Sequence, residues 1–345
     1  MKKLFLFIVV AVLCFSCKRE EVFIPRNIVD VEIETVFKDS LLSLRAIEIM
    51  NKEALFIAGN NSFWGVYAPY KDTIFVDNDF GEHKKLHFRA AARTNEGSFA
   101  LSIESPARLF ADHKLVYQEN HPKAFYDSMD FWNDKEGIAI GDPTGDCMSI
   151  IITRDGGATW TKLSCDDLPK AKTGEGAFAA SDTNIAIVDD HAWVATGGKA
   201  SRVLYSPDKG NTWEMFETPI VQGAETTGIF SIDFYDELNG FAIGGDYTRP
   251  DDNVANKIRT TDGGKTWQLV AENKNPGFRS CVQYMPGRKG QELVAIGFKG
   301  IDYSNDAGAS WKHLSDEGFY TIRFLNDSVA YAAGAGRISK LIFSE

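Results

Sequence analysis

Six charged side chains stand near the starts of expected strands, where they could gather into one binding site. Three are arginines that follow an apolar residue in the similar stretches "LRA", "FRA" and "FRS". Guanidinium groups that converge on one axis favour binding of an anionic group, because each can donate two parallel hydrogen bonds to a carboxylate. Two acidic residues at similar depth could balance this positive charge. The six candidates are Arg45, Arg89, Asp127, Glu175, Arg279 and Arg323.

The same residues also have a purely structural interpretation. Arginines that point into a narrow channel can pair with Asp127, with Glu175 and with backbone carbonyl groups, and so hold the channel together. The sequence leaves both interpretations open. It contains no CxxC motif, no glycine-rich loop that opens a helix and no metal-ligand spacing, so we expect neither a cofactor nor a metal.

Four eight-residue stretches indicate which elements position these residues. They share the pattern Ser/Thr-x-Asp-x-Gly-x-Ser/Thr-Trp, as in "TRDGGATW" at residues 153–160. The aspartate can accept hydrogen bonds from backbone N–H groups of a tight turn, and the glycine two positions after it supplies a positive φ without strain. We therefore predict four hairpin caps that serve the fold. Their residues are Asp155, Gly157 and Trp160; Asp208, Gly210 and Trp213; Asp262, Gly264 and Trp267; and Asp306, Gly308 and Trp311.

The spacing of these caps predicts the architecture. The aspartates are 53, 54 and 44 residues apart, which is typical of a four-stranded propeller blade with variable loops. Seven stretches show the period-2 apolar alternation and polar turns of paired strands. The last of them lacks a fourth strand, and residues 29–37 alternate like an orphan strand. The prediction is an all-β, seven-bladed β-propeller of four-stranded antiparallel blades, one domain at 29–345, closed by pairing of the N-terminal strand with the last blade.

The eight-residue pattern is identified as the Asp-box, or bacterial neuraminidase repeat. With the strand pair "SIDFYDELNGFAIGGD", the chain from about residue 40 resembles the propeller family of photosystem II stability and assembly factors and their non-photosynthetic relatives. Those relatives are often labelled oxidoreductases, but no motif in this chain supports redox chemistry. The resemblance implies a binding or assembly scaffold.

Sialidases also carry Asp-boxes, which keeps a second function open. Arg45, Arg89 and Arg279 could mimic the sialidase arginine triad, with Asp127 and Glu175 as carboxylates at the channel mouth. The sialidase fold has six blades, however, and the chain reads "FIPR" where a "RIP" segment is expected. A carbohydrate-active enzyme of the sialidase or another glycoside hydrolase type is therefore the alternative to the scaffold.

The first seventeen residues have the pattern of an export signal. Lys2 and Lys3 precede the apolar run Leu4–Val12, which is too short to span a membrane. Cys17 follows directly and resembles the lipidated first residue of bacterial lipoproteins. We therefore expect a lipid on Cys17, a tether at residues 18–28 and a place in the envelope of a Gram-negative bacterium, on the periplasmic or the outer face.

The net charge of the chain and its aromatic residues in loops indicate which kinds of partner the protein could bind. The formal net charge is −11 at pH 7, so a nucleic acid partner is not expected. An envelope protein or a glycan is expected instead, with membrane contact through the lipid only. Trp64 and Tyr247 stand in loop-like contexts, where they could form a binding platform or pack between blades.

Three cysteines lie in the body of the chain. If Thr153 faces Thr159 across its turn, Cys147 lies opposite Cys165, and an exported protein could join them in a disulfide. Two reduced cysteines on neighbouring strands are the alternative. Cys281 lies in an apolar strand, and we expect it to be a small buried side chain.

Overall fold

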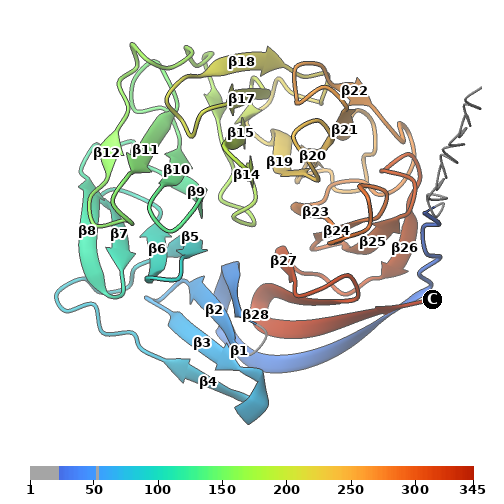
Figure 1. Ribbon diagram of the computed structural model, residues 1–345, viewed down its shortest axis with the longest axis horizontal. Coiled ribbons are helices and arrows are strands. Elements are labelled where there is room, and N and C mark those ends of the chain that lie inside the picture. Colours follow the sequence, from blue (N-terminus) through green and yellow to red (C-terminus); the bar gives the residue numbers. More distant parts are fainter. Residues whose placement is uncertain (1–22, 52–53) are drawn as a thin grey trace, which may run out of the picture.

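The protein is a ring of small antiparallel sheets arranged around a central axis like the blades of a propeller (Figure 1). The computed structural model describes residues 23–51 and 54–345. The predicted signal peptide and the lipidation site at Cys17 lie outside the described residues. Within the described part, no helix is long and apolar enough to cross a membrane.

Four of the sheets are simple four-stranded units with hydrogen-bonded orders β5-β6-β7-β8, β12-β11-β10-β9, β14-β15-β17-β18 and β23-β24-β25-β26. Their middle strands are buried on both faces, because each blade is packed between two neighbours. The bounds are Phe88–Arg93 (β5), Ser98–Ser102 (β6), Ala107–Ala111 (β7), Lys114–Glu119 (β8), Tyr126–Phe131 (β9), Gly137–Gly141 (β10), Ser149–Thr153 (β11), Thr161–Lys162 (β12), Ile185–Val188 (β14), His191–Ala195 (β15), Arg202–Ser206 (β17), Glu214–Glu217 (β18), Cys281–Tyr284 (β23), Leu293–Gly297 (β24), Gly300–Ser304 (β25) and Lys312–Ser315 (β26).

The other two sheets have six strands each, in the orders β27-β28-β1-β2-β3-β4 and β13-β16-β19-β20-β21-β22. A short 3₁₀ helix, Pro69–Lys71 (η1), joins β3 to β4. The strand bounds are Asp30–Asn51 (β1), Ala54–Gly59 (β2), Trp64–Ala68 (β3), Thr73–Val76 (β4), Thr321–Phe324 (β27), Val329–Ser344 (β28), Glu175–Gly176 (β13), Gly197–Gly198 (β16), Thr227–Phe234 (β19), Gly240–Asp246 (β20), Lys257–Thr260 (β21) and Gln268–Leu269 (β22).

The N-terminal strand closes the ring, as predicted. The first part of β1 pairs with β28 from Asp30 opposite Ser344 to Lys38 opposite Arg337. The second part of β1 pairs with β2. The two ends of the chain are therefore joined by a ladder of backbone hydrogen bonds, and neither leaves an open edge at the seam.

The number of sheets differs from the prediction. Counted as continuous hydrogen-bonded sheets the propeller has six blades, so the expectation of seven separate four-stranded blades was wrong. The last predicted repeat is present as β27 and β28. It is fused to the first repeat, because β1 runs without interruption from its ladder with β28 into its ladder with β2.

The hydrophobic core is divided among the spaces between neighbouring sheets. One cluster joins β5–β8 to β9–β12 and includes Trp160, and another joins the sheet of β14–β18 to that of β19–β22 and includes Trp267. The Asp-box turns have the same hydrogen bonds in all four copies. In one of them Asp262 accepts from the backbone N–H and the hydroxyl of Thr266, and the Trp267 indole donates to the Gly264 carbonyl. Each turn is thus satisfied by its own side chains.

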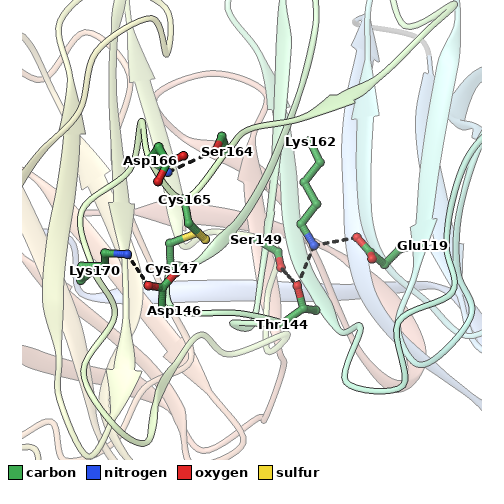
Figure 2. The surroundings of a disulfide bond; sticks show 10 residues. All are labelled: Glu119, Thr144, Asp146, Cys147, Ser149, Lys162, Ser164, Cys165, Asp166 and Lys170. Atoms are coloured by element: carbon green, nitrogen blue, oxygen red, sulfur yellow. Dashed lines mark hydrogen bonds and ion pairs between the residues drawn. A yellow bond between two sulfur atoms is a disulfide. The ribbon is translucent and has the colours of Figure 1, made fainter.

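A disulfide joins Cys147 to Cys165, with a Cα–Cα distance of 5.4 Å (Figure 2). It ties the long loop after β10 to the loop after β12. The ion pair between Lys170 and Asp146 lies beside it. The remaining described cysteine, Cys281, is buried and reduced.

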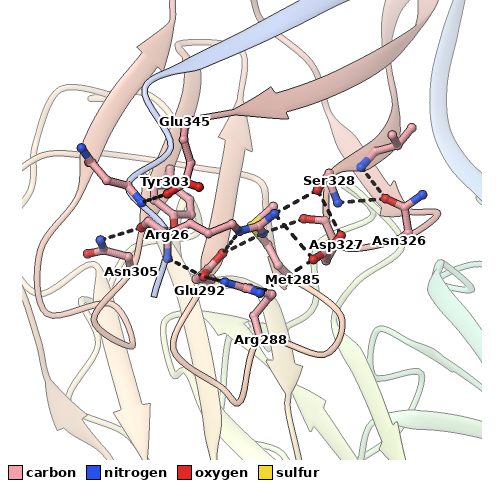
Figure 3. A network of polar contacts seen from close by, with 12 residues as sticks. Arg26, Met285, Arg288, Glu292, Tyr303, Asn305, Asn326, Asp327, Ser328 and Glu345 are labelled. Carbon is pink, nitrogen blue, oxygen red and sulfur yellow. Dashed lines mark hydrogen bonds and ion pairs between the residues drawn. The ribbon is translucent and has the colours of Figure 1, made fainter. Parts of the chain in front are cut away.

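The described part of the expected tether, residues 23–28, lies against the propeller (Figure 3). The Arg26 guanidinium donates to the Glu292 carboxylate at 2.7 and 2.9 Å and to the Ser328 hydroxyl at 2.9 Å. Arg288 donates to the other oxygen of Glu292 at 2.7 Å. Because Ile28 is also fully buried, this segment is docked to the sheet of β23–β26.

Candidate functional site

Residues 177–184, here called the central segment, leave their blade and occupy the middle of the ring (Figure 1). The sequence pattern predicted that a strand of the inner ring starts near Glu175. The structure has only the two-residue β13 there, and the inner strand β14 begins at Ile185. The Asp182 carboxylate accepts hydrogen bonds from the backbone N–H groups of Ala91 in β5, at 2.8 Å, and Met129 in β9, at 3.1 Å. The segment therefore bridges strands from different blades.

Further contacts fasten the central segment to the opposite side of the ring. The Ser181 hydroxyl donates to the Ser280 carbonyl at 2.6 Å, and the Ser181 carbonyl accepts from the Thr321 hydroxyl at 2.8 Å. The Thr183 carbonyl accepts from the Ile232 N–H at 2.8 Å. Most of its side chains are small, which lets the backbone pass through the narrow channel. The channel is thus filled along part of its axis.

One mouth of the channel holds a pocket of about 470 Å³ above the central segment. Its wall is mainly aromatic. Phe178 stacks on Phe230 with 3.7 Å between ring centroids, and Phe230 meets Phe278 edge-on at 4.7 Å. Tyr247 and Phe298, at the rim, are 45% and 43% exposed. The aromatic residues of the pocket are Phe125, Phe178, Phe230, Tyr247, Phe278, Phe298 and Tyr320.

Two of the predicted arginines, Arg45 and Arg89, lie in this pocket. Arg45 donates to the Ala180 carbonyl at 2.9 Å and lies over the Tyr320 ring, 3.7 Å from its centroid. Arg89 donates to the Ala179 carbonyl at 2.8 Å. Burial, and then the charge of Arg89, lower the pKa of Arg45 to about 10. The two arginines are therefore held by carbonyl oxygens of the central segment. These uncharged groups neutralise the positive charge of Arg45 and Arg89 poorly.

The other two predicted arginines lie elsewhere. Arg279 is buried and donates to the Asp302 carboxylate at 2.6 Å. Arg323 donates to the Glu48 carboxylate at 2.9 Å and to the Asp182 carbonyl at 3.0 Å, so it holds the other end of the central segment. The structure thus does not assemble the three-arginine arrangement of Arg45, Arg89 and Arg279.

The two predicted acids do not form a carboxylate pair at an open cleft. Glu175 is buried and accepts two hydrogen bonds from Arg202, at 3.0 and 2.5 Å, and one from the Thr196 hydroxyl at 2.7 Å. Asp127 is fully buried, and among the described residues neither of its oxygens has a hydrogen-bond partner within normal geometry. Burial, and then the nearby Asp142, raise the pKa of Asp127 well above its ordinary value. Neither acid is placed to meet a substrate.

The aromatic wall was missed by the sequence analysis, although a signal was present. Phe125 directly precedes β9, Tyr320 directly precedes β27, and Phe278 stands three residues before β23. An aromatic residue recurring just before an inner strand predicts rings gathered at one end of the channel. Of the two aromatic residues that the sequence singled out, Tyr247 lines the pocket and Trp64 is buried.

Comparisons with known proteins agree with this fold. The BNR/Asp-box repeat matches residues 258–269, and no curated protein matches the chain. Among solved structures, "YCF48 bound to D1 peptide" has a TM-score of 0.64 and 11% identity, covering 94% of this chain and 100% of that one. YCF48 from Cyanidioschyzon merolae has a TM-score of 0.62 and 12% identity, covering 90% and 98%.

A structure of the RRP9 WD40 repeats has a TM-score of 0.62 and 9% identity, covering 92% of this chain and 99% of that one. At such identities the likeness concerns the fold alone. The chain is an all-β propeller that carries a BNR/Asp-box repeat and is structurally similar to YCF48.

Proposed function

We propose that this protein is a binding or assembly scaffold that holds an apolar segment of a partner protein in the aromatic pocket. The pocket is the observation that carries the proposal. It is concave and built at the ends of strands, and seven of its fifteen lining residues are aromatic. Four charged residues, Arg45, Arg89, Asp142 and Glu225, complete a mixture of apolar and polar groups that is typical of a ligand-binding site. Its volume of about 470 Å³ lies within the usual range of such sites.

Part of the pocket wall is formed by packed aromatic rings. Phe230 and Phe278 are buried beneath the rim and pack against each other, so their rings are fixed. Tyr247 and Phe298 leave nearly half of their surface available to a partner. Aromatic residues of this kind are the usual energetic centres of protein interfaces. The similarity to a YCF48 structure with a bound D1 peptide adds support for a peptide-binding scaffold.

We further propose that the protein is exported and attached by a lipid on Cys17 to the envelope of a Gram-negative bacterium, where its partner is an envelope protein. The run of apolar residues before Cys17 supports this. Growth with an alkyne-labelled fatty acid should label the wild-type protein and leave Cys17→Ala unlabelled. Labelling of Cys17→Ala, or no labelling of either protein, would contradict the anchor.

We do not propose the glycoside hydrolase alternative. Glu175 is engaged by Arg202 and Thr196, and Asp127 is fully buried. A glycan remains a second kind of ligand for the same pocket, since aromatic rings also stack on sugars, and the experiment below includes it.

The binding proposal is tested by selecting a library of displayed random peptides on the purified protein, with a glycan array in parallel. The wild type should enrich peptides rich in aromatic and apolar residues. Replacing both Tyr247 and Phe298 by Ala should weaken binding of a selected peptide about 30- to 1,000-fold, because each truncated interface residue of this type costs about 1–2 kcal/mol.

Leu238→Ala is the matched control, because Leu238 is 57% exposed but lies outside the pocket. It should bind the selected peptide as the wild type does. Binding that is insensitive to the Tyr247 and Phe298 changes would refute the pocket as the site. Enrichment of glycans in place of peptides would refute the peptide assignment.

A further inference from the structure

We propose that a short tether holds the end of the propeller opposite the aromatic pocket against a lipid surface, so that the pocket opens away from the membrane. This orientation rests on the lipid proposed above for Cys17. It is argued from residues 23–28, here called the docked segment. The docked segment lies at the rim of the ring near β26 and leads directly into β1 (Figure 1).

The docked segment and the aromatic pocket lie at opposite ends of the ring. Arg26 binds Glu292, in the turn between β23 and β24, and Ser328, in the turn between β27 and β28. The pocket residues Phe278 and Tyr320 instead stand before β23 and β27. Since β23 and β27 run from the pocket to these two turns, the docked segment is fixed at the far end of both strands.

Backbone contacts also hold the docked segment in place (Figure 3). The Arg26 N–H donates to the Glu292 carboxylate at 2.9 Å. The Arg26 carbonyl accepts from the Tyr303 hydroxyl and the Asn305 amide, both at 2.9 Å. Ile28 is fully buried. Because the segment is bound to the propeller, we expect it to add no length to the tether between the lipid and the protein.

The tether is shorter than the ring is high. Five residues separate Cys17 from Phe23, so covalent geometry limits the distance between the Cα atoms of Cys17 and Phe23 to about 20 Å. From the docked segment, β1 rises about 25 Å between Asp30 and Lys38. Lys38 is at the pocket end, because Arg337, opposite it, donates to the loop before β27. A lipid on Cys17 therefore keeps the membrane at the end that carries the docked segment.

The side chains beside the tether fit the headgroup region of a membrane. Ile24 is 77% exposed. The guanidinium carbon of Arg288 and the Nζ of Lys289 lie 5.0 and 5.8 Å from the centroid of the Phe23 ring, and Lys289 is exposed. Apolar and aromatic side chains beside cations are typical of surfaces that lie on a membrane, where the cations meet anionic headgroups.

The test compares two exposed positions at opposite ends of β25. Ala309 lies in the turn between β25 and β26, on the side of the docked segment, and Lys299 lies in the turn between β24 and β25, on the side of the pocket. Ala309→Cys and Lys299→Cys are made in the full-length lipoprotein and labelled with a fluorescent maleimide. Labelling is selective among the described residues, because Cys147 and Cys165 are joined and Cys281 is buried.

The labelled proteins are incorporated into vesicles of phosphatidylethanolamine, phosphatidylglycerol and a lipid with a nitroxide quencher on its headgroup. The Ala309→Cys label should lose most of its fluorescence, and the Lys299→Cys label should keep most of it. Equal quenching, or stronger quenching of the Lys299→Cys label, would overturn the orientation. Flotation of the vesicles reports the anchor separately. Protein that does not float with them would refute the anchor and the orientation together, whereas floating protein with the wrong quenching refutes the orientation alone.

A longer tether is the matched control. Inserting about twelve Gly and Ser residues between positions 22 and 23 raises the maximum reach of the tether to about 60 Å and leaves the docked segment unchanged. This protein should float as before, but its two labels should be quenched to similar extents. A difference between the labels as large as with the natural tether would overturn the tether as the cause of the orientation.

Discussion

At the residue scale, the end of the channel opposite the aromatic pocket gathers acidic side chains whose ionisation is suppressed. Burial, and then the nearby Glu48, raise the pKa of Asp130 to about 7. Burial also raises the pKa of Asp233 to about 7, although the backbone N–H groups of Tyr284 and Phe234 donate to its carboxylate and oppose the shift. Both aspartates therefore gain protons on folding in mildly acidic solution.

These shifts predict that stability falls as the pH rises from about 4 to about 7. Within this window the folded protein retains protons that the unfolded chain, with an aspartate pKa of 3.8, has released. The contribution is fully present below the unfolded value and is lost above about 7. Asp233→Asn should therefore reduce the difference in unfolding free energy between pH 5 and pH 8 by about 1 kcal/mol, allowing for partial exposure.

Urea denaturation at both pH values measures this difference. The control is Asp166→Asn, because Asp166 is exposed and its carboxylate accepts no hydrogen bond from the described residues. An Asp233→Asn protein with an unchanged pH dependence would show that Asp233 titrates normally in the folded state.

At the element scale, the central segment joins several blades through polar contacts. Asp182 is its main anchor, because one carboxylate satisfies backbone donors of β5 and β9. Arg45 and Arg89 hold the same segment from the pocket side, and Arg323 holds it from the other side. The arginines that the sequence offered as a site thus act partly as supports for the pocket floor.

We predict that Asp182→Ala lowers the free energy of unfolding by about 2–6 kcal/mol, since a buried donor left without an acceptor costs about 1–3 kcal/mol and two would be left. Urea denaturation measures the change. Asp166→Ala, which removes an exposed carboxylate, should have an effect below about 0.5 kcal/mol. Equal stability of the Asp182→Ala and Asp166→Ala proteins would mean that the central segment contributes little to the fold.

At the scale of the whole molecule, stability depends on the ladder between β1 and β28, which joins the two ends of the chain. It buries Val31, Leu341 and Phe343 in the core shared with β23–β26. The docked residues before β1, with Arg26 bound to Glu292, extend the same closure. Because this ladder joins the first described strand to the last, we expect it to hold the ring shut.

A chain that ends at Gly336 should therefore lose cooperative unfolding or melt at least 10 °C lower than the full chain. Thermal unfolding followed by circular dichroism measures this effect. Removal of Glu345 alone, which is exposed and lies beyond β28, serves as the control and should change the melting temperature only slightly. A sharp transition at the wild-type temperature in the truncated chain would show that the ring closes without this ladder.

The sequence by itself determined the features that depend on neighbouring residues. The Asp-box turns are made by the hydroxyl, carboxylate and glycine of each eight-residue stretch, so their pattern predicts them directly. The strand periodicity predicted an all-β propeller, and the unpaired first and last strands predicted its closure. Cys147 and Cys165 are joined in the structure, although the ladder of β11 and β12 is shifted by one residue from the expected register and sets Ile152 opposite Thr161.

Only the tertiary structure decided which distant residues meet at the axis. Arg45 and Arg89 share a pocket whereas Arg279 and Arg323 have acidic partners elsewhere, because the position of each arginine depends on the loops and side chains of neighbouring blades. The path of residues 177–184 through the channel depends on donors from strands up to about 140 residues away. Fusion of the first and last repeats through β1 likewise follows from long-range pairing, which no local pattern records.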